Sequence, residues 1–199
     1  GRGASVFQRY QSMQMAGISW LLIAFLGMLP FLFSAALAPV GSLNAEALGV
    51  FNHTLMALFE SVSGFTSTEL TVVARAGDLP AHIQWWRSFS EWIGGIGVIL
   101  LLIAVLPAER GALNLYFSEA REEKILPTVK STVRTIWLIY IGYTVVSVGL
   151  LWLAGEPAWR ALNHGMTAIA TGGFTITNDS LISTPAGVQL AYIPIMIAG

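Results

Sequence analysis

The stretch from Met15 to Ala38 contains no charged residue, and it limits the possible folds more than any other part of the chain. At about 1.5 Å per residue, a helix of this length exceeds the ~30 Å hydrocarbon core of a bilayer. The whole chain is 55% hydrophobic and only 11% charged. A soluble domain carries roughly 25% charged residues, so too few are present here to cover a soluble surface. The sequence therefore predicts an integral membrane protein.

Three later segments are also predicted to enter the membrane, at residues 82–106, 132–155 and 187–199, the last of them cut short. The segment at 82–106 opens with the polar and aromatic run Gln84-Trp85-Trp86-Arg87, which is typical of a membrane interface. Residues 107–131 hold the densest group of charges and are predicted to form a loop or short amphipathic helix outside the membrane. The chain opens Gly1-Arg2-Gly3 and ends within an apolar run, which predicts a piece of a longer protein.

The basic residues predict the orientation of the chain in the membrane. Most of them lie before the first span or between the second and the third, at Arg2, Arg9, Arg110, Arg121, Lys124, Lys130 and Arg134. Loops on the cytoplasmic side carry an excess of Lys and Arg. Residues 1–14 are therefore predicted to be a cytoplasmic lead-in, and residues 107–131 a cytoplasmic loop.

Two short segments are similar to each other and lie in matching surroundings. ALFESVSGFTSTEL at 57–70 aligns without a gap with ALNHGMTAIATGGF at 161–174. Each follows an apolar span, and each is too short and too polar to cross the membrane. Helix, half-helix, polar loop and second helix is the order of an ion-pore repeat, so the sequence predicts two tandem repeats, at 15–106 and 132–199. Both loops are predicted to enter from outside.

The half-helix and filter of each repeat are placed at 45–70 and 157–174. Non-helical backbone at membrane depth is tolerated only where protein buries it or where it lines a wet cavity. A second register would match Gly64-Phe65-Thr66 with Gly173-Phe174-Thr175, but it shortens the second half-helix by about a turn. The gap-free register is therefore preferred.

The residues that end the two half-helices suit the binding of a dehydrated cation. Backbone carbonyls and hydroxyls can replace a hydration shell, glycine permits unusual backbone geometry, and the carbonyl end of a helix carries partial negative charge. The alternative is that each loop merely turns the chain. The candidate ion-binding residues are Thr66, Ser67, Thr68, Glu69, Ala170, Thr171, Gly172 and Gly173.

Four further polar residues are candidates for a supporting role. Glu60 and His164 hold equivalent positions in the half-helices, and ionisable groups at membrane depth are often functional. Either they contact the cation or they hydrogen-bond to nearby backbone and fix the half-helix. Asn178 and Asp179 follow the second loop and form either a negatively charged vestibule or a solvated loop. Glu91 is expected to pair with Arg87, four residues earlier.

Several classes of protein are disfavoured. The chain has no cysteine, which excludes a disulfide or a thiolate metal site within it. Its net charge of −1 argues against nucleic-acid binding. No His, Asp or Glu cluster has metal-ligand spacing, and the glycines at 94, 95 and 97 lie in an apolar helix rather than in a phosphate loop. An enzyme is not expected, and neither is a covalent cofactor.

The sequence resembles the Trk/Ktr/HKT superfamily of potassium transporters, and most closely the bacterial TrkH/TrkG-type subunit. The matching blocks fall in the order of the family and cover nearly the whole chain: ALFESVSGFTSTEL, WWRSFSEWIGGIGVILLLIAVLP, LPTVKSTVRTIWLIYIG and ALNHGMTAIATGGF. The resemblance implies an all-α polytopic fold with four pore repeats, of which this chain would supply the first two. It also implies that K+ is the transported ion.

The family has one filter glycine per repeat, and the resemblance places Gly173 at that position in the second repeat. Glu69 stands at the corresponding position of the first repeat, where its β-carbon would resist a glycine-like backbone. Three outcomes are open: altered selectivity, tight binding with slow passage, or a non-conducting scaffold or sensor with the same fold.

The resemblance further implies where the protein works and with what. It implies a bacterial plasma (inner) membrane protein in a lipid bilayer, with K+ uptake that is passive or coupled to another ion, as in symport. The remaining two repeats would come from the rest of the chain or from a second chain, and a homodimer is implied. A cytosolic nucleotide-binding regulatory subunit of the TrkA type is the implied partner, with residues 107–131 as its contact.

Overall fold

The computed structural model describes residues 2–105 and 129–199, and the side chains of residues 11, 14–98 and 132–199. All of the regular elements in the described part are helical. The long helices are α1 (Arg2–Gly27), α5 (Ala81–Val105) and α7 (Val129–Leu153). The shorter elements are α2 (Leu29–Leu37), α3 (Leu43–Leu48), η1 (Gly49–Asn52), α4 (Thr54–Phe65), η2 (Ala76–Asp78), α8 (Ala158–Ile169) and α9 (Ala186–Ala198). The predicted charged loop falls largely on residues 106–128, which lie outside the described residues.

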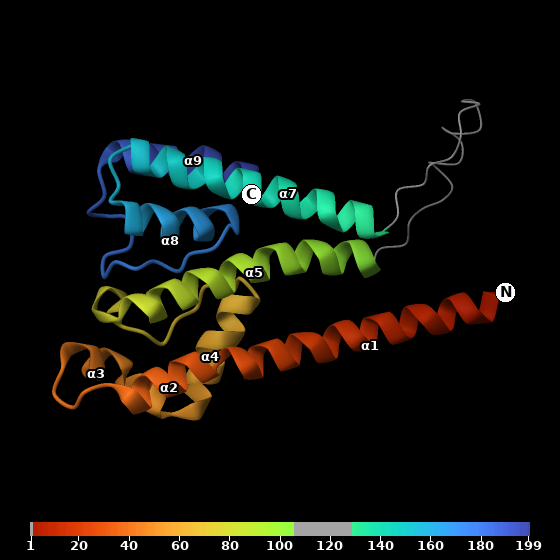
Figure 1. Ribbon diagram of the computed structural model, residues 1–199, viewed down its shortest axis with the longest axis horizontal. Helices are drawn as coiled ribbons and strands as arrows, with labels where there is room; N and C mark the ends of the chain where they lie inside the picture. Colours follow the sequence, from red (N-terminus) through yellow and green to blue (C-terminus); the bar gives the residue numbers. More distant parts are fainter. Residues whose placement is uncertain (1, 106–128) are drawn as a thin grey trace.

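The long helices run lengthwise through the molecule, and the two half-helices, α4 and α8, pack among them (Figure 1). Helix α4 contacts α1 and α5, whereas α8 contacts α5 and α7. Helix α5 therefore touches both half-helices. The N-terminus, the last residues of α5 and the first residues of α7 lie at one end, and the turn between α7 and α8 lies at the other (Figure 1).

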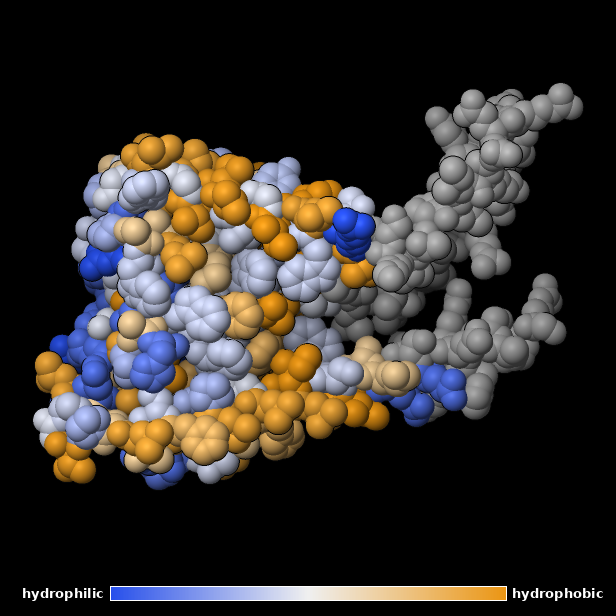
Figure 2. All heavy atoms as spheres, viewed as in Figure 1, coloured by the Kyte–Doolittle hydropathy of each residue, from blue (hydrophilic) through white to orange (hydrophobic). Residues whose placement is uncertain are grey.

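Apolar side chains cover the outside of the long helices. Two helical stretches, Gln14–Leu37 and Thr132–Leu153, are long and apolar enough to cross a bilayer. Leu21 on α1 and Trp152 on α7 are 64% and 62% exposed. Figure 2 shows hydrophobic atoms along the edge formed by α1 and α2, and hydrophilic atoms gathered at the end opposite the N-terminus. Contiguous exposed apolar surface of this kind suits contact with lipid.

The first half-helix, α4, packs against α1 and α2 near the break between them. Pro30 cannot donate a backbone hydrogen bond, and the helix is interrupted at Met28. Near this break, the carbonyl of Gly27 accepts a 2.9 Å hydrogen bond from the Trp86 indole, and the Ser61 hydroxyl donates to the carbonyl of Ala24 at 2.7 Å. These bonds fasten α4 and α5 to the first span.

The segment 45–70, predicted to hold one half-helix and its filter, instead contains three separate helical pieces before the loop, namely α3, η1 and α4. Ser42 caps α3 by accepting a hydrogen bond from the backbone N–H of Ala45 at 3.1 Å. The chain continues as the 3-10 helix η1 and then becomes extended at His53, with φ −93° and ψ 113°. Because His53 leaves the helical conformation, α4 starts again at Thr54. The half-helix is thus shorter than the sequence predicts.

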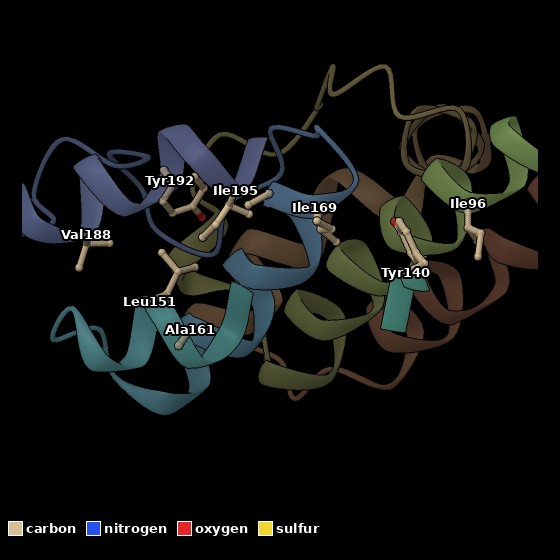
Figure 3. Close-up of a cluster of buried hydrophobic side chains, with 9 residues drawn as sticks. Ile96, Tyr140, Leu151, Ala161, Ile169, Val188, Tyr192 and Ile195 are labelled. Carbon is tan, nitrogen blue, oxygen red and sulfur yellow. The ribbon is translucent and has the colours of Figure 1, made fainter. Parts of the chain in front are cut away.

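Two clusters of buried side chains hold the helices together. The cluster in Figure 3 joins α5, α7, α8 and α9 through Ile96, Tyr140, Leu151, Ala161, Ala168, Ile169, Val188, Tyr192 and Ile195. The second joins α2, α4 and α5 with the segments between them through Phe31, Leu48, Phe51, Ala57, Val73, Ala76, Leu79 and Ile83. Each half-helix thus packs into its own core, and α5 contributes to both.

Candidate functional site

The two half-helices end in the same backbone conformation. The residue two positions after each helix is left-handed, with φ 50° at Ser67 and φ 52° at Thr171. At the end of α4, three hydrogen bonds of 2.9–3.0 Å join Thr66 N to Val62 O, Ser67 N to Gly64 O, and Thr68 N to Ser63 O. At the end of α8, Ala170 N, Thr171 N and Gly172 N bond to Met166 O, Ala168 O and Thr167 O at 3.3, 3.1 and 2.8 Å.

These matching bonds follow the gap-free alignment of the two segments. Thr66 corresponds to Ala170, and Ser67 corresponds to Thr171, as that alignment requires. The alternative register would pair Thr66 with Thr175, which lies well beyond the turn. The shared local conformation arises because each half-helix ends in small and hydroxyl residues that can close the last turn.

The loop that follows α4 (the first loop) and the loop that follows α8 (the second loop) line one cavity of about 240 Å³. Thr66 and Ser67 contribute from the first loop, and Ala170 and Thr171 contribute from the second. Gly95 on α5 lies in the same wall. Since each half-helix ends at this cavity, both helix dipoles place partial negative charge beside it.

Glu69 and Gly173, which are equivalent in the alignment, lie against each other. A Cβ atom built on Gly173 would overlap Oε2 of the Glu69 carboxylate. The sequence predicts a glycine-like backbone that glutamate would resist at this position. In the structure it is Glu69 that is left-handed, with φ 69°, and Gly173 is not. At this pair of equivalent positions, the left-handed residue is therefore in the first loop, and its carboxylate extends to the second loop.

The hydroxyls of the first loop are partly used within it. The Thr66 hydroxyl donates to the carbonyl of Val62 at 2.7 Å and lies 2.6 Å from the hydroxyl of Thr68. The Ser67 hydroxyl contacts the backbone carbonyl of Glu91 at 3.5 Å. In the second loop, Thr171 and Gly173 are exposed and Gly172 is buried.

Glu60 is fully buried and ties α4 to the chain that follows the first loop. Its Oε1 accepts a 2.8 Å hydrogen bond from the Thr71 hydroxyl, and its Oε2 accepts one of 3.0 Å from the backbone N–H of Val72. Arg87 on α5 completes a buried ion pair with Glu60, with 2.8 Å between Nε and Oε1. A charge removed from water requires such a partner.

Arg87 joins the segments that follow both loops. It is 1% exposed, and its Nη1 donates to the carbonyl of Thr175 at 3.0 Å while Nη2 donates to Thr71 Oγ1 at 3.2 Å. Its guanidinium lies 4.3 Å from the centre of the Phe174 ring. Of the run Gln84-Trp85-Trp86-Arg87, which is predicted to lie at the membrane interface, Gln84 and Arg87 are buried within the protein.

Glu91 does not form the predicted pair with Arg87. Its Oε1 accepts hydrogen bonds from the backbone N–H groups of Gly173 and Phe174 at 3.0 and 3.3 Å. Arg87 already has Glu60 as its carboxylate partner, so Glu91 is free to reach the second loop. The sequence signal for both contacts was an acid and a base inside an otherwise apolar span, but the partners come from distant segments.

His164 is anchored to the start of its half-helix. Its Nδ1 lies 2.6 Å from Oε1 of Glu156, the residue before the cap of α8, and both side chains are buried. The ring of Tyr192 packs at 6.1 Å from the His164 ring. Sequence reasoning missed Glu156, although a carboxylate just before a half-helix with a buried histidine was the available signal.

Asn178 and Asp179 lie where the two halves of the molecule meet. Oδ1 of Asn178 accepts a 2.7 Å hydrogen bond from the backbone N–H of Gly77, which joins the segments after the two loops. With Asp78 and Arg160, both residues line a pocket of about 380 Å³. A hydrogen bond from the Ser183 hydroxyl lowers the pKa of Asp179, which keeps its carboxylate charged.

The profile of the cation transport protein family TrkH matches residues 12–199. The chain belongs to this family. It is 39% identical over 192 residues to an uncharacterized cation transporter from Methanocaldococcus jannaschii, covering 96% of the chain and 37% of that protein. The Trk system potassium uptake protein TrkH of Salmonella typhimurium is 36% identical over 188 residues, covering 90% of the chain and 36% of that protein.

The fold agrees with a solved member of the TrkH family. The crystal structure of the potassium transporter TrkH from Vibrio parahaemolyticus superposes with a TM-score of 0.72 and 26% identity, covering 94% of the chain and 35% of that protein. The chain thus spans little more than a third of the length of these relatives. It is an all-helical membrane protein of a transporter family, and its relatives are named as transporters rather than enzymes.

Proposed function

We propose that this TrkH-family chain forms part of a pathway for K+ uptake across the bacterial plasma membrane. The observation that carries this proposal is that the two loops that follow the half-helices, each with a left-handed residue at its start, line one cavity. Oxygen atoms from both loops and the negative ends of two helices then lie around the same space. The names of the curated relatives support K+ as the transported ion.

Transport in this account needs no covalent chemistry and no cofactor. K+ exchanges its hydration shell for carbonyl and hydroxyl oxygens of the loop residues Thr66, Ser67, Thr68, Glu69, Ala170, Thr171, Gly172 and Gly173. It then moves down its electrochemical gradient, alone or with a coupled ion. Glu60 and His164 hold the half-helices from behind, and Asn178 and Asp179 lie at the outer entrance.

The pore needs further protein to be complete. Two loops cannot surround an ion on four sides, and the chain spans little more than a third of its relatives. The remaining repeats come either from a longer product of the same gene or from a second chain. A homodimer and a cytosolic nucleotide-binding regulatory subunit of the TrkA type complete the proposed assembly.

A second candidate function is a non-conducting membrane scaffold or sensor. The observation that favours it is the Glu69 carboxylate, which lies against Gly173 between the two loops. A carboxylate in this place binds a cation more tightly than neutral carbonyls do, and it also fills space that a passing ion needs. The two functions make opposite predictions for replacement of Glu69 by glycine.

The test is K+-limited growth and rubidium uptake in cells that lack their own K+ uptake systems. The full product of the gene that encodes this chain is expressed unchanged and as Glu69→Gly. Uptake by the unchanged protein supports the transporter and shows that the pathway tolerates the carboxylate. Uptake only by Glu69→Gly supports the scaffold or sensor. Absence of uptake by both, with both proteins present in the membrane, contradicts the transport proposal.

A further inference from the structure

The carboxyl group of Glu91 lies directly behind the second loop. Its Oε1 accepts hydrogen bonds from the backbone N–H groups of Gly173 and Phe174, at 3.0 and 3.3 Å. A Cβ atom built on Gly172 would overlap this carboxyl group. The side chain is 0% exposed, so water does not compete for these hydrogen bonds. Glycine at position 172 is thus what lets the loop backbone approach so closely.

Peptide geometry turns these hydrogen bonds into control over carbonyl direction. In a planar trans peptide, the C=O of one residue and the N–H of the next point in opposite directions. The N–H of Gly173 points to Glu91, so the carbonyl of Gly172 points away from Glu91. The N–H of Phe174 fixes the carbonyl of Gly173 in the same way. Within the described residues, no protein group donates a hydrogen bond to either carbonyl.

Arg87, one helical turn earlier on α5, holds the next part of the same segment. Its Nη1 donates a hydrogen bond to the carbonyl of Thr175 at 3.0 Å, and its guanidinium lies over the Phe174 ring. Helix α5 therefore binds N–H groups at 173 and 174 and a carbonyl at 175. It thus supplies a hydrogen-bond partner for each of these three backbone groups.

We propose that Glu91 is a positioning residue for ion selectivity. Because its carboxylate binds the N–H groups of Gly173 and Phe174, it keeps the carbonyls of Gly172 and Gly173 available to the cation at a fixed spacing. This inference rests on the proposed function, since it assumes that the second loop binds the transported ion. It assigns to a buried acid outside the loops a role in choosing K+ over Na+.

The test compares two replacements of similar size in the full gene product. Glu91→Gln keeps an oxygen acceptor at the same place, whereas Glu91→Leu removes it. Ser88→Ala is the matched control, because the Ser88 hydroxyl is equally buried but bonds within its own helix, to Gln84 O. Rubidium uptake is measured with increasing Na+ as competitor, and the folded fraction of each protein is measured by size-exclusion chromatography after heating.

Glu91→Leu is expected to lose about tenfold in preference for Rb+ over Na+, which corresponds to about 1.4 kcal/mol in relative binding. Glu91→Gln and Ser88→Ala are expected to keep the preference of the unchanged protein. Unchanged selectivity in folded Glu91→Leu overturns the inference, and so does an equal loss in Glu91→Gln. If Glu91→Leu does not fold, Glu91→Asp decides, because it withdraws the acceptor by one methylene: unchanged selectivity there overturns the inference. No Rb+ uptake by the unchanged protein counts against the proposed function instead.

Discussion

At the scale of single residues, Glu69 and Gly173 show how closely the two loops depend on each other. Gly173→Ala places a methyl group where the Glu69 carboxylate now lies, so one of the two must move. We expect Gly173→Ala to lower rubidium uptake about tenfold or more, which corresponds to about 1.4 kcal/mol in a transport barrier. Adding Glu69→Gly removes the obstructing side chain and is expected to restore part of the uptake.

The control for this pair is Gly149→Ala. A Cβ at Gly149 on α7 meets no atom within 4 Å, so uptake should not change. If Glu69→Gly fails to improve transport by Gly173→Ala, the carboxylate is not the group that the new methyl displaces, and the described contact between the loops does not govern the pathway.

The buried pair of Glu60 and Arg87 gives a second prediction at this scale. Removing one partner of a buried pair leaves an uncompensated charge and costs about 3–5 kcal/mol. Glu60→Leu and Arg87→Leu should each lower the midpoint of thermal unfolding in detergent, and the double variant should lose less than the sum of the two. A double-mutant cycle measures this difference. Strict additivity would show that the two side chains do not stabilise each other.

At the scale of helices, close approach between α7 and α8 depends on Gly165. A Cβ at this position would lie 2.6 Å from Cγ2 of Val148 and 3.1 Å from its backbone Cα and N. The Val148 backbone cannot move aside without shifting α7. We expect Gly165→Ala to destabilise the protein by about 1–3 kcal/mol, the usual effect of overpacking.

Thermal unfolding of purified protein in detergent checks the Gly165 prediction. Gly142→Ala on α7 is the comparison, since its Cβ would meet no atom within 4 Å and alanine is the better helix former. Equal unfolding midpoints for Gly165→Ala and Gly142→Ala would contradict the packing of α8 against α7.

The helices differ in how far the sequence could predict them. The helical stretch Thr132–Leu153 was accessible because the long run after Arg134 is uncharged and has few alternatives to a membrane helix. The ends of the half-helices were accessible because a run of small and hydroxyl residues follows each of them. The break at His53 was not accessible, since residues 45–65 are apolar enough to read as one helix and only the turn geometry separates them.

The contacts of the charged side chains in α5 needed the tertiary structure. Pairing of Arg87 with Glu91 satisfies the spacing of a helix, and a single helix offers no reason to reject it. Packing of α4 against α5 gives Arg87 a better partner in Glu60, and packing of α8 against α5 gives Glu91 the second loop. Such choices depend on which segments meet, which short-range patterns do not specify.

At the scale of the whole molecule, the distribution of basic residues predicts which end faces the cytoplasm. The chain has no cysteine, so single cysteines can be introduced without removing any from it. Gln11 near the start of α1 and Ala186 at the start of α9 are both exposed and suit this purpose. In intact cells, a membrane-impermeant maleimide is expected to label Ala186→Cys but not Gln11→Cys.

Permeabilising the cells is the control for this labelling experiment. Gln11→Cys should then become reactive, which shows that its earlier protection came from the membrane and not from burial. Any cysteine elsewhere in the full gene product is replaced beforehand. The reverse labelling pattern would contradict the orientation predicted from the basic residues, and the loops would then enter the membrane from the cytoplasm.

The two loops are proposed to belong to one selective cation pathway. The most direct test is K+ flux through the purified full gene product in liposomes, with Na+ flux measured in parallel. We expect K+ flux that exceeds Na+ flux, that falls in Gly173→Ala and that is unchanged in Gly149→Ala. Equal K+ and Na+ flux, or K+ flux that Gly173→Ala leaves intact, would contradict this proposal.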